Sequence, residues 1–222
     1  VYARNRSYVG SYRKMQYADP SVTDSRVLLT DRKNILTDKG LYDILSTAGV
    51  SGRRNYSTLR NCQIYDNVSE RYAGAVRISG SNSLIENCVI RNNKHLSSSY
   101  GGGGVYLSNA KIINSKITDN ESNGQGGGIY ASGGSVINCL VSNNWAKMSG
   151  GIFGSPSLVL NTTVVKNSSE HEYANDYAGL NTWSTEIVNC IVWGNTHQGE
   201  YAEIMSGGIY GSPSLVLNTT IV

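Results

Sequence analysis

The sequence has almost no phenylalanine or proline, few charged residues and no long apolar run. Its 222 residues include 1 Phe, 3 Pro and 4 Cys, but 15 Tyr and 25 Gly. Charged residues make up 16% of the chain, below the roughly 25% of an average globular domain. No apolar segment reaches the ~18 residues of a membrane-spanning helix, so we expect no membrane span in this segment. The net charge of +3 is too small to favour nucleic acid or an anionic membrane as a partner.

The small positive excess lies at the beginning of the chain. Residues 1–55 hold 10 Lys and Arg against 5 Asp and Glu, whereas residues 56–222 hold 9 and 11. The first part shows no firm repeat, and a short helix from Asp38 to Thr47 competes there with degenerate strands. We predict an irregular N-terminal cap or degenerate rungs in residues 1–55, and repeats in residues 56–222.

Asparagine recurs at nearly constant intervals through the second part. We call these residues the rung asparagines: Asn61, Asn87, Asn114, Asn138, Asn161, Asn189 and Asn218. The steps between them are 26, 27, 24, 23, 28 and 29 residues by subtraction. Self-similarity with a period of roughly 20–50 residues is typical of a solenoid. The sequence therefore predicts about seven stacked rungs.

Aliphatic residues flank each rung asparagine at fixed distances. Two residues before it lie Leu59, Ile85, Ile112, Val136, Val159, Ile187 and Val216. Three residues after it lie Ile64, Ile90, Ile117, Val141, Val164, Val192 and Ile221. Most are β-branched, and the residues between them alternate with period two, which indicates strands that face a packed core.

A glycine precedes most rung asparagines by ten residues and opens another short strand. These strands begin at Val76, Val105, Ile129, Ile152, Leu180 and Ile209. Each rung is thus expected to contain three strands and three turns. The fold class predicted is all-β, a parallel β-helix with rungs ~4.8 Å apart.

The rung asparagines interrupt the alternation, as a bend between two strands would. Asparagine tolerates left-handed backbone angles, so we expect such angles at these positions. Stacked on successive rungs, their amides are expected to hydrogen-bond along the axis as a ladder.

Each cysteine directly follows a rung asparagine. The cysteines are Cys62, Cys88, Cys139 and Cys190, and the other rungs place Ser115, Thr162 and Thr219 at the same position. A position that accepts Cys, Ser or Thr is a slot for a small side chain, so we expect buried free thiols. Pairing of Cys62 with Cys88 on neighbouring rungs stays open.

The Gly-Gly-Ile strand starts and the (Ile/Val)-x-x-Asn strand ends carry a family resemblance. They resemble the repeats of polymorphic outer-membrane proteins and the β-helix repeats of secreted Bacteroidetes proteins with pectin-lyase-like folds. The outer-membrane motif has Phe where this chain has Ile, as in Ile64-Tyr-Asp-Asn67 and Ile90-Arg-Asn-Asn93. That departure favours the broader secreted family. The resemblance implies a right-handed coil displayed outside the cell or on a bacterial surface, and it specifies no activity.

The middle residue of each glycine-started strand should face outward, which defines a first candidate binding site. Its residues are Arg77, Tyr106, Tyr130, Phe153, Asn181 and Tyr210. Aromatic side chains at rung spacing can stack against sugar rings. The alternative is a self-stacking ladder that only stiffens the sheet.

The residue just before each rung asparagine should also face outward, and it becomes apolar along the chain. The apolar members are Ile113, Ile137, Leu160, Val188 and Leu217. They predict a docking surface for a neighbouring domain or partner protein. Cover by a loop, or partial burial at the bend, is the alternative.

Two long turns, Ser168–Ala178 and Thr196–Ser206, lie where insertions mark the working edge of a solenoid. They carry Glu170, His171, Glu172, Asp176, His197, Glu200 and Glu203. Carboxylates with His can bind a divalent metal or perform acid–base chemistry, but the spacing matches no known ligand set. Solvated loop charges are the preferred explanation. We predict no catalytic residue, metal or cofactor.

Met148–Val165 and Met205–Val222 are nearly identical, so two rungs have been duplicated as a block. Lengthening by copied rungs suits a spacer or display surface better than a single catalytic site. We therefore expect a non-catalytic, secreted or surface-displayed module for adhesion or for binding glycan or protein. The alternative is a polysaccharide lyase or glycoside hydrolase. The sequence begins without Met and ends within a repeat, so we expect it to belong to a longer chain.

Overall fold

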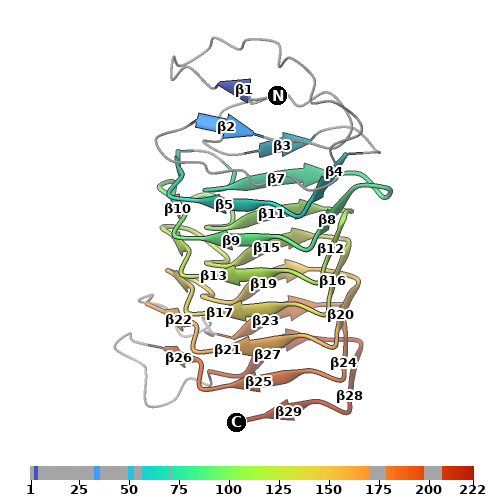
Figure 1. Cartoon of the computed structure of the whole chain (residues 1–222). Helices are drawn as coiled ribbons and strands as arrows, with labels where there is room; N and C mark the ends of the chain where they lie inside the picture. The colour runs from blue at the N-terminus through green and yellow to red at the C-terminus, as the bar shows by residue number, and fades with distance from the viewer. Residues whose placement is uncertain are drawn as a thin grey trace.

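The chain folds into a column of stacked rungs (Figure 1). The structure is a computed structural model that describes residues 57–70, 72–170, 179–197 and 207–222, and the backbone of three short strands before them. Of these three, β1 (Ala3–Arg4) and β2 (Lys33–Ile35) pair antiparallel. The third, β3 (Val50–Gly52), pairs in parallel with the first strand of the following rung.

Four parallel sheets run along the column. Each rung contributes one strand to each sheet, except the last rung, which in the described residues has no strand in the fourth. The first sheet contains β3, β7 (Val76–Ser79), β11 (Val105–Ser108), β15 (Ile129–Ser132), β19 (Ile152–Ser155), β23 (Leu180–Trp183) and β27 (Ile209–Ser212). The second contains β4 (Thr58–Arg60), β8 (Leu84–Glu86), β12 (Lys111–Ile113), β16 (Ser135–Ile137), β20 (Leu158–Leu160), β24 (Glu186–Val188) and β28 (Leu215–Leu217).

The third sheet contains β5 (Gln63–Tyr65), β9 (Val89–Arg91), β13 (Lys116–Thr118), β17 (Leu140–Ser142), β21 (Thr163–Val165), β25 (Ile191–Trp193) and β29 (Thr220–Ile221). The fourth contains β6 (Val68–Ser69), β10 (Lys94–His95), β14 (Glu121–Ser122), β18 (Trp145–Ala146), β22 (Ser168–Ser169) and β26 (Thr196–His197). The parallel stacking and the three predicted strands per rung are confirmed. The fourth strand is an addition: two residues after each third strand's turn also pair with the neighbouring rungs. The helix considered over Asp38–Thr47 lies outside the described residues.

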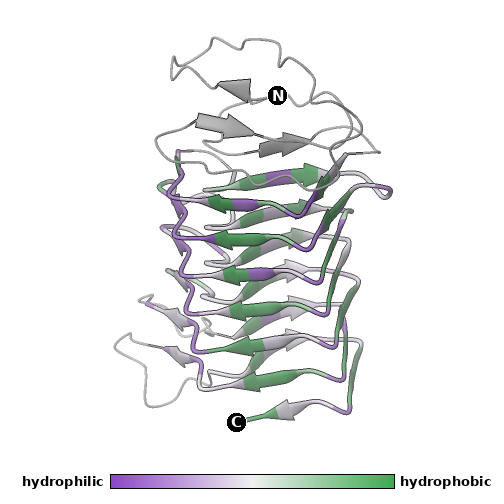
Figure 2. Cartoon of the chain, viewed as in Figure 1, coloured by the Kyte–Doolittle hydropathy of each residue, from purple (hydrophilic) through white to green (hydrophobic). Residues whose placement is uncertain are grey.

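The core is a set of aliphatic columns inside the coil, as the flanking residues of the rung asparagines predicted. Figure 2 shows apolar residues recurring at the same place on successive rungs. From Leu59 to Ile187 in the second sheet, and from Ile64 to Val192 in the third, every predicted aliphatic is at most 1% exposed. The last pair, Val216 and Ile221, is 42% and 48% exposed, because it lies on the final rung and has a neighbour on one side only.

The rung asparagines bend the chain, and two pairs of them form the hydrogen bonds along the axis that the predicted ladder requires. All seven have φ between 48° and 55°, as expected for left-handed bends. Their side chains point away from the core, and most are exposed. Hydrogen bonds between rung amides join Asn138 to Asn114 (3.3 Å) and Asn189 to Asn161 (2.7 Å). A left-handed bend turns the side chain outward, so these amides lie at the surface, where water competes with the bonds between them.

A different set of asparagines, six residues further along each rung, forms the continuous ladder. We call it the buried asparagine ladder: Asn67, Asn93, Asn120, Asn144, Asn167 and Asn195. In each step Nδ2 donates to Oδ1 of the next member at 2.9–3.0 Å. The same Oδ1 also accepts the backbone N–H of the preceding member at 2.9–3.1 Å. The ladder satisfies the polar groups of the turn between the third and fourth sheets, which would otherwise be buried without partners.

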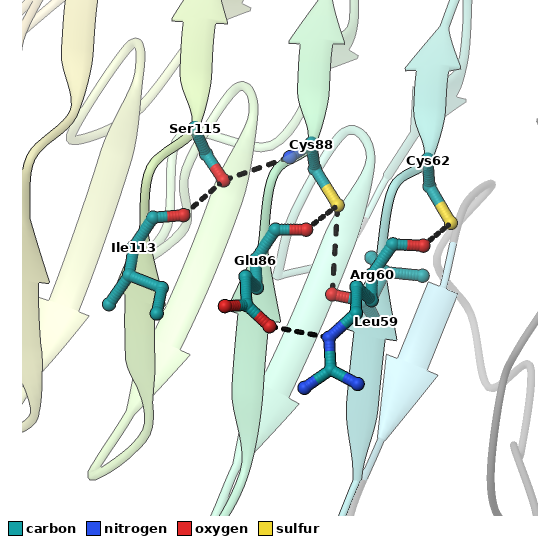
Figure 3. A network of polar contacts seen from close by, with 7 residues as sticks. All are labelled: Leu59, Arg60, Cys62, Glu86, Cys88, Ile113 and Ser115. Carbon is teal, nitrogen blue, oxygen red and sulfur yellow. Dashed lines mark hydrogen bonds and ion pairs between the residues drawn. The ribbon is translucent and has the colours of Figure 1, made fainter. Parts of the chain in front are cut away.

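The position after each rung asparagine is the small, buried slot that the cysteines and hydroxyl residues share (Figure 3). Sγ of Cys88 donates to Glu86 O at 3.2 Å, and Oγ of Ser115 donates to Ile113 O at 2.8 Å. The Ser115 hydroxyl also accepts the backbone N–H of Cys88 at 3.1 Å. All four cysteines are buried and free, so Cys62 and Cys88 are not joined by a disulfide.

The four thiols are expected to be unreactive in the folded protein. Burial raises the pKa of Cys139 to about 11 and also raises the pKa of Cys190, because it penalises the thiolate. A hydrogen bond with Cys62 instead lowers the pKa of Cys88, but this thiol is 1% exposed and therefore closed to reagents. At pH 8, Ellman's reagent should titrate almost no thiol in the native protein and all four after denaturation in guanidinium. Rapid native labelling of Cys139 would contradict this. As a control, Cys139→Ser should change the free energy of unfolding by less than about 1 kcal/mol, since serine already fills the slot at Ser115.

Glycines precede the first strand where the chain crosses the neighbouring rung closely. A Cβ on Gly103 would lie 2.6 Å from Glu121 O, and a Cβ on Gly127 would lie 2.6 Å from Gly150 O. Neither residue has a positive φ, so the neighbouring backbone alone excludes a side chain there. Close approach between rungs, rather than an unusual backbone angle, explains these glycines.

Candidate functional site

The outer face of the first sheet carries the predicted aromatic column. Strand register aligns one residue from each rung into a row: Arg77, Tyr106, Tyr130, Phe153, Asn181 and Tyr210. Their neighbours along each strand point into the core, as the alternation in the sequence predicted. Phe153 is 7% exposed and Asn181 2%, so the outward register alone does not give access to solvent.

The rings in the middle of this column stack on one another. The ring centres of Tyr106 and Tyr130 are 5.0 Å apart with planes 21° apart, and those of Tyr130 and Phe153 are 5.9 Å apart at 20°. Each face of Tyr130 therefore lies against another ring. A sugar cannot stack on the central rings, so a ligand can meet only their edges and the tyrosine hydroxyls.

Three further aromatic residues form the rim of the column, and the repeat pattern of the sequence did not identify them. Tyr72 meets Tyr106 edge-on at 5.7 Å, Tyr100 meets Tyr130 at 6.0 Å, and Trp183 meets Phe153 at 5.4 Å. Tyr72 is 36% exposed, Tyr100 66% and Trp183 38%. Their rings keep exposed surface, so the rim rather than the stacked centre offers aromatic surface to a ligand.

Arg77 closes the N-terminal end of the column. Its guanidinium carbon lies 3.7 Å from the ring centre of Tyr72 and 5.5 Å from that of Tyr106. Nη1 is buried without a hydrogen-bond partner, so the aromatic faces supply most of its local stabilisation. The cation is thus held between rings of the same face.

A second outward column runs beside the aromatic one, and all its residues except Trp183 are serines. It occupies the fourth position of each first-sheet strand: Ser79, Ser108, Ser132, Ser155, Trp183 and Ser212. Ser132, Ser155 and Ser212 are exposed. The serine recurs in the sequence, but the repeat pattern identified only the second residue of each strand as outward-facing, so the fourth position was missed. We call the two columns together the hydroxyl–aromatic face.

From Tyr106 to Phe153 the hydroxyl–aromatic face carries no charged side chain. Burial, followed by the neighbouring phenols of Tyr106 and Tyr100, raises the pKa of Tyr130. The Tyr130 hydroxyl therefore stays protonated at any physiological pH and can donate a hydrogen bond. At the far end Asn181 Oδ1 is buried without a partner, which leaves one unused acceptor in the column.

A shallow polar hollow lies where the chain leaves the serine column. It has a volume of about 480 Å³ and is lined by Gly80, Ser81, Asn109, Lys111, Gly134, Ser135 and Ser157. Ser79 and Ser108 directly precede its lining residues Gly80 and Asn109 in the chain. The hydroxyl-rich surface therefore extends from the first sheet onto this turn.

The second sheet carries the predicted apolar column. Ile113, Ile137, Leu160 and Val188 are half-buried, and Leu217 is 47% exposed. At its N-terminal end the column becomes polar, because Arg60 Nε and Glu86 Oε2 pair at 2.5 Å (Figure 3). The residues form one continuous strip, and their role in docking stays a prediction.

Most of the acidic residues of the two long turns lie outside the described part of the chain. Two of the titratable turn residues are described. Glu170 is exposed, and His197 is buried with its Nδ1 3.0 Å from Ser169 Oγ. Within the described ranges, no group of three or more His, Cys, Asp or Glu side chains could hold a metal ion. The described residues also include no helix long and apolar enough to cross a membrane.

These features define a parallel β-solenoid whose faces differ in chemistry. The profile of the family described as "Right handed beta helix region" matches residues 21–169, which is more than half of the chain. The protein therefore belongs to the right-handed β-helix family. Searches of curated proteins and of solved structures return no match.

Proposed function

We propose that this protein is a non-catalytic β-helix module that binds a neutral, hydroxyl-rich glycan on the hydroxyl–aromatic face. One observation carries the proposal: serine and tyrosine hydroxyls recur at one-rung spacing on an uncharged stretch of the first sheet, between exposed aromatic residues. A polysaccharide repeats its hydroxyl groups along an extended chain, so a regular row of hydroxyls can bond to it at several successive points.

The arrangement of the aromatic residues supports an axial orientation for the ligand. The stacked centre, Tyr106 and Tyr130, offers hydroxyls and ring edges. Tyr100 and Trp183 are the two most exposed rings of the rim, and they flank that centre on different rungs. A glycan lying along the coil would bond to the hydroxyl columns and contact an aromatic ring toward each end.

We also propose that the module works outside the cell or on a bacterial surface. Support comes from the resemblance of its Gly-Gly-Ile and x-x-Asn repeats to those of displayed and secreted β-helix proteins. Treating intact producing cells with protease should remove the protein while leaving an intracellular marker uncut. Protection of the protein in intact cells and absence from the medium would contradict display.

Blocking the serine column tests the binding face without disturbing the aromatic stack. Ser132→Tyr places a bulky group on an exposed position of β15, and Gln63→Tyr makes a matched change on the exposed outer face of β5. On an array of neutral polysaccharides (β-glucan, xylan, mannan) and a uronic polysaccharide, the unaltered protein should retain neutral polymers. Ser132→Tyr should weaken that retention at least tenfold, about 1.4 kcal/mol, whereas Gln63→Tyr should not change it.

Three outcomes would overturn the proposal. They are retention of no polysaccharide, equal retention by both variants, or release of new sugar ends during incubation. Preference for the uronic polymer would keep a binding module but reject the neutral ligand class.

A further inference from the structure

His95 occupies an inward position of the fourth sheet, where four of the other five rungs place small residues and the last places His197. The column reads Ser69, His95, Ser122, Ala146, Ser169 and His197. The His95 side chain is 0% exposed. Its Nδ1 lies 3.1 Å from Ser122 Oγ, which also accepts the backbone N–H of Gly124 at 3.1 Å.

The second ring nitrogen of His95 has no hydrogen-bond partner. Nε2 is buried and unpaired. A neutral imidazole can leave Nε2 as a bare acceptor while Nδ1 bonds to Ser122. A protonated ring must donate from both nitrogens, and the described surroundings of Nε2 offer it no acceptor. Burial accordingly lowers the pKa of His95 to about 4.

The ring of His95 lies against Gly101, at the point where the segment of Tyr100 meets the backbone of Tyr72. A Cβ on Gly101 would lie 2.5 Å from His95 Cε1 and 2.7 Å from Nε2, and it would also strike Tyr72 O. Gly102 N–H donates to that same Tyr72 carbonyl at 2.9 Å, which ties the two segments together. Tyr100 directly precedes Gly101, so Tyr72 and Tyr100 both extend from backbone that lies against or beside this imidazole.

No described charged group faces the ring from the elements packed around it. The inward neighbours on β6 and β14 are Ser69 and Ser122. The charged residues nearby are Glu70, directly after β6, Lys94 on β10 and Glu121 on β14. All three occupy outward or exposed positions, and Lys94 pairs with Glu121. The phenols of Tyr72 and Tyr100 belong to the exposed rim. Burial alone lowers the pKa of His95, and no carboxylate among the described residues lies ready to stabilise an imidazolium.

We propose that His95 is an acid-sensitive latch: protonation of its ring separates the segments of Tyr72 and Tyr100 and opens the aromatic rim while the coil stays folded. Release of bound glycan by this opening rests on the proposed function, but the opening itself does not. The device is local because the latch touches a turn, whereas the sheets are held by the buried asparagine ladder and the core.

The pH dependence of the opening follows from the pKa of His95 in the open form and in the closed form. An open, solvated His95 has a pKa near 6.5 and the closed one a pKa of about 4, so below pH 6.5 the open form binds a proton that the closed form does not. The free energy that favours the closed form over the open form is therefore greatest above pH 6.5, and it decreases as the pH falls toward 4. The opening constant rises by up to tenfold per pH unit in this window, on the order of 100-fold in total.

Fluorine NMR of the full chain labelled with 3-fluorotyrosine tests the latch without any ligand. Tyr100→Phe and Tyr72→Phe assign the two rim resonances. From pH 7.5 to 3.5 both resonances should shift in one transition between pH 6.5 and 4, while the far-UV circular dichroism of the sheets is unchanged. In His95→Asn, which cannot titrate, the transition should vanish. In His197→Asn, the matched change at the other buried histidine beside a serine, it should remain.

Persistence of the transition in His95→Asn overturns the proposal, as does its loss in His197→Asn alone. So does a wild-type protein whose rim resonances do not move, or whose sheets melt at the same pH. If His95→Asn does not fold, the imidazole Cε1 proton of wild-type His95 decides. A midpoint near 4 that coincides with the rim transition supports the latch, and an ordinary midpoint near 6.5 rejects it. Failure of the glycan array with a working latch rejects only the proposed function.

Discussion

Replacing Asn120 by alanine is expected to destabilise the fold by about 4 kcal/mol. The Asn120 amide takes part in four buried hydrogen bonds: it accepts from the backbone and side chain of Asn93, and it donates to Ile90 O and Asn144 Oδ1. Alanine removes all four. It leaves the Asn93 backbone N–H without its acceptor inside the coil, and an orphaned buried group costs about 1–3 kcal/mol in addition to the lost bonds.

The matched control is Asn87→Ala, at a rung asparagine one rung away. Asn87 has a φ of 53° and an exposed side chain, so alanine should cost only about 1 kcal/mol of left-handed backbone strain. Guanidinium unfolding followed by far-UV circular dichroism measures both. Equal losses for the two variants would show that the buried asparagine ladder contributes no more than an ordinary bend.

Gly127→Ala is expected to cost about 3 kcal/mol or more, although the change adds a single methyl group. The new Cβ would strike Trp145 O, at the end of the same rung, and lie 2.6 Å from Gly150 O, on the next rung. These backbone carbonyl groups cannot rotate away from the new Cβ as a flexible side chain could. The two rungs must therefore move apart. Because every rung rests only on its neighbours, that displacement weakens pairing in all four sheets at this level.

Gly194→Ala separates this steric effect from backbone strain. Gly194 has a φ of 59°, and nothing lies within 4 Å of the position that a Cβ would take there, so only about 1 kcal/mol of left-handed strain is expected. Thermal unfolding should rank the variants with Gly127→Ala well below Gly194→Ala. The reverse order would mean that contact between rungs at the glycine column is not what excludes side chains.

The repeat predicted the coil because the core obeys one rule at every rung. Aliphatics at Ile85 and Ile90, on either side of a bend at Asn87, recur in each copy, and both are completely buried. A fold of this kind can be predicted from the repeat without knowing which distant parts of the chain are in contact, since each rung packs only on the next. The architecture was therefore accessible from the chain alone.

The same reasoning missed the buried asparagine ladder for a definable reason. Asn114 and Asn120 belong to the same rung and recur equally well, so periodicity does not distinguish them. A left-handed φ of 50° sends the Asn114 side chain out, whereas Asn120 has no such angle and is 1% exposed. The repeat predicts the bend at Asn114. Whether the Asn114 or the Asn120 amide is buried depends on the path of the chain from the third sheet into the fourth.

The sequence predicted which strand positions form the candidate face. It did not predict all the aromatic residues on that face. Tyr106 and Tyr130 lie in the expected row, but their ring faces are used by each other. The exposed rings, Tyr72 and Tyr100, come from turns that have no fixed place in the repeat. Contacts between a turn and a strand of another rung are non-local, so a pattern within one repeat does not contain them.

The hydrogen bonds that join the rungs run along the column, and this direction determines its response to force. A load applied between the two ends pulls on these bonds in line, one layer after another. Each layer that gives way frees the 23–29 residues between successive rung asparagines, roughly 75–105 Å of extended chain. The molecule would thus lengthen in discrete steps, as a serial tether that dissipates tension gradually instead of rupturing at once.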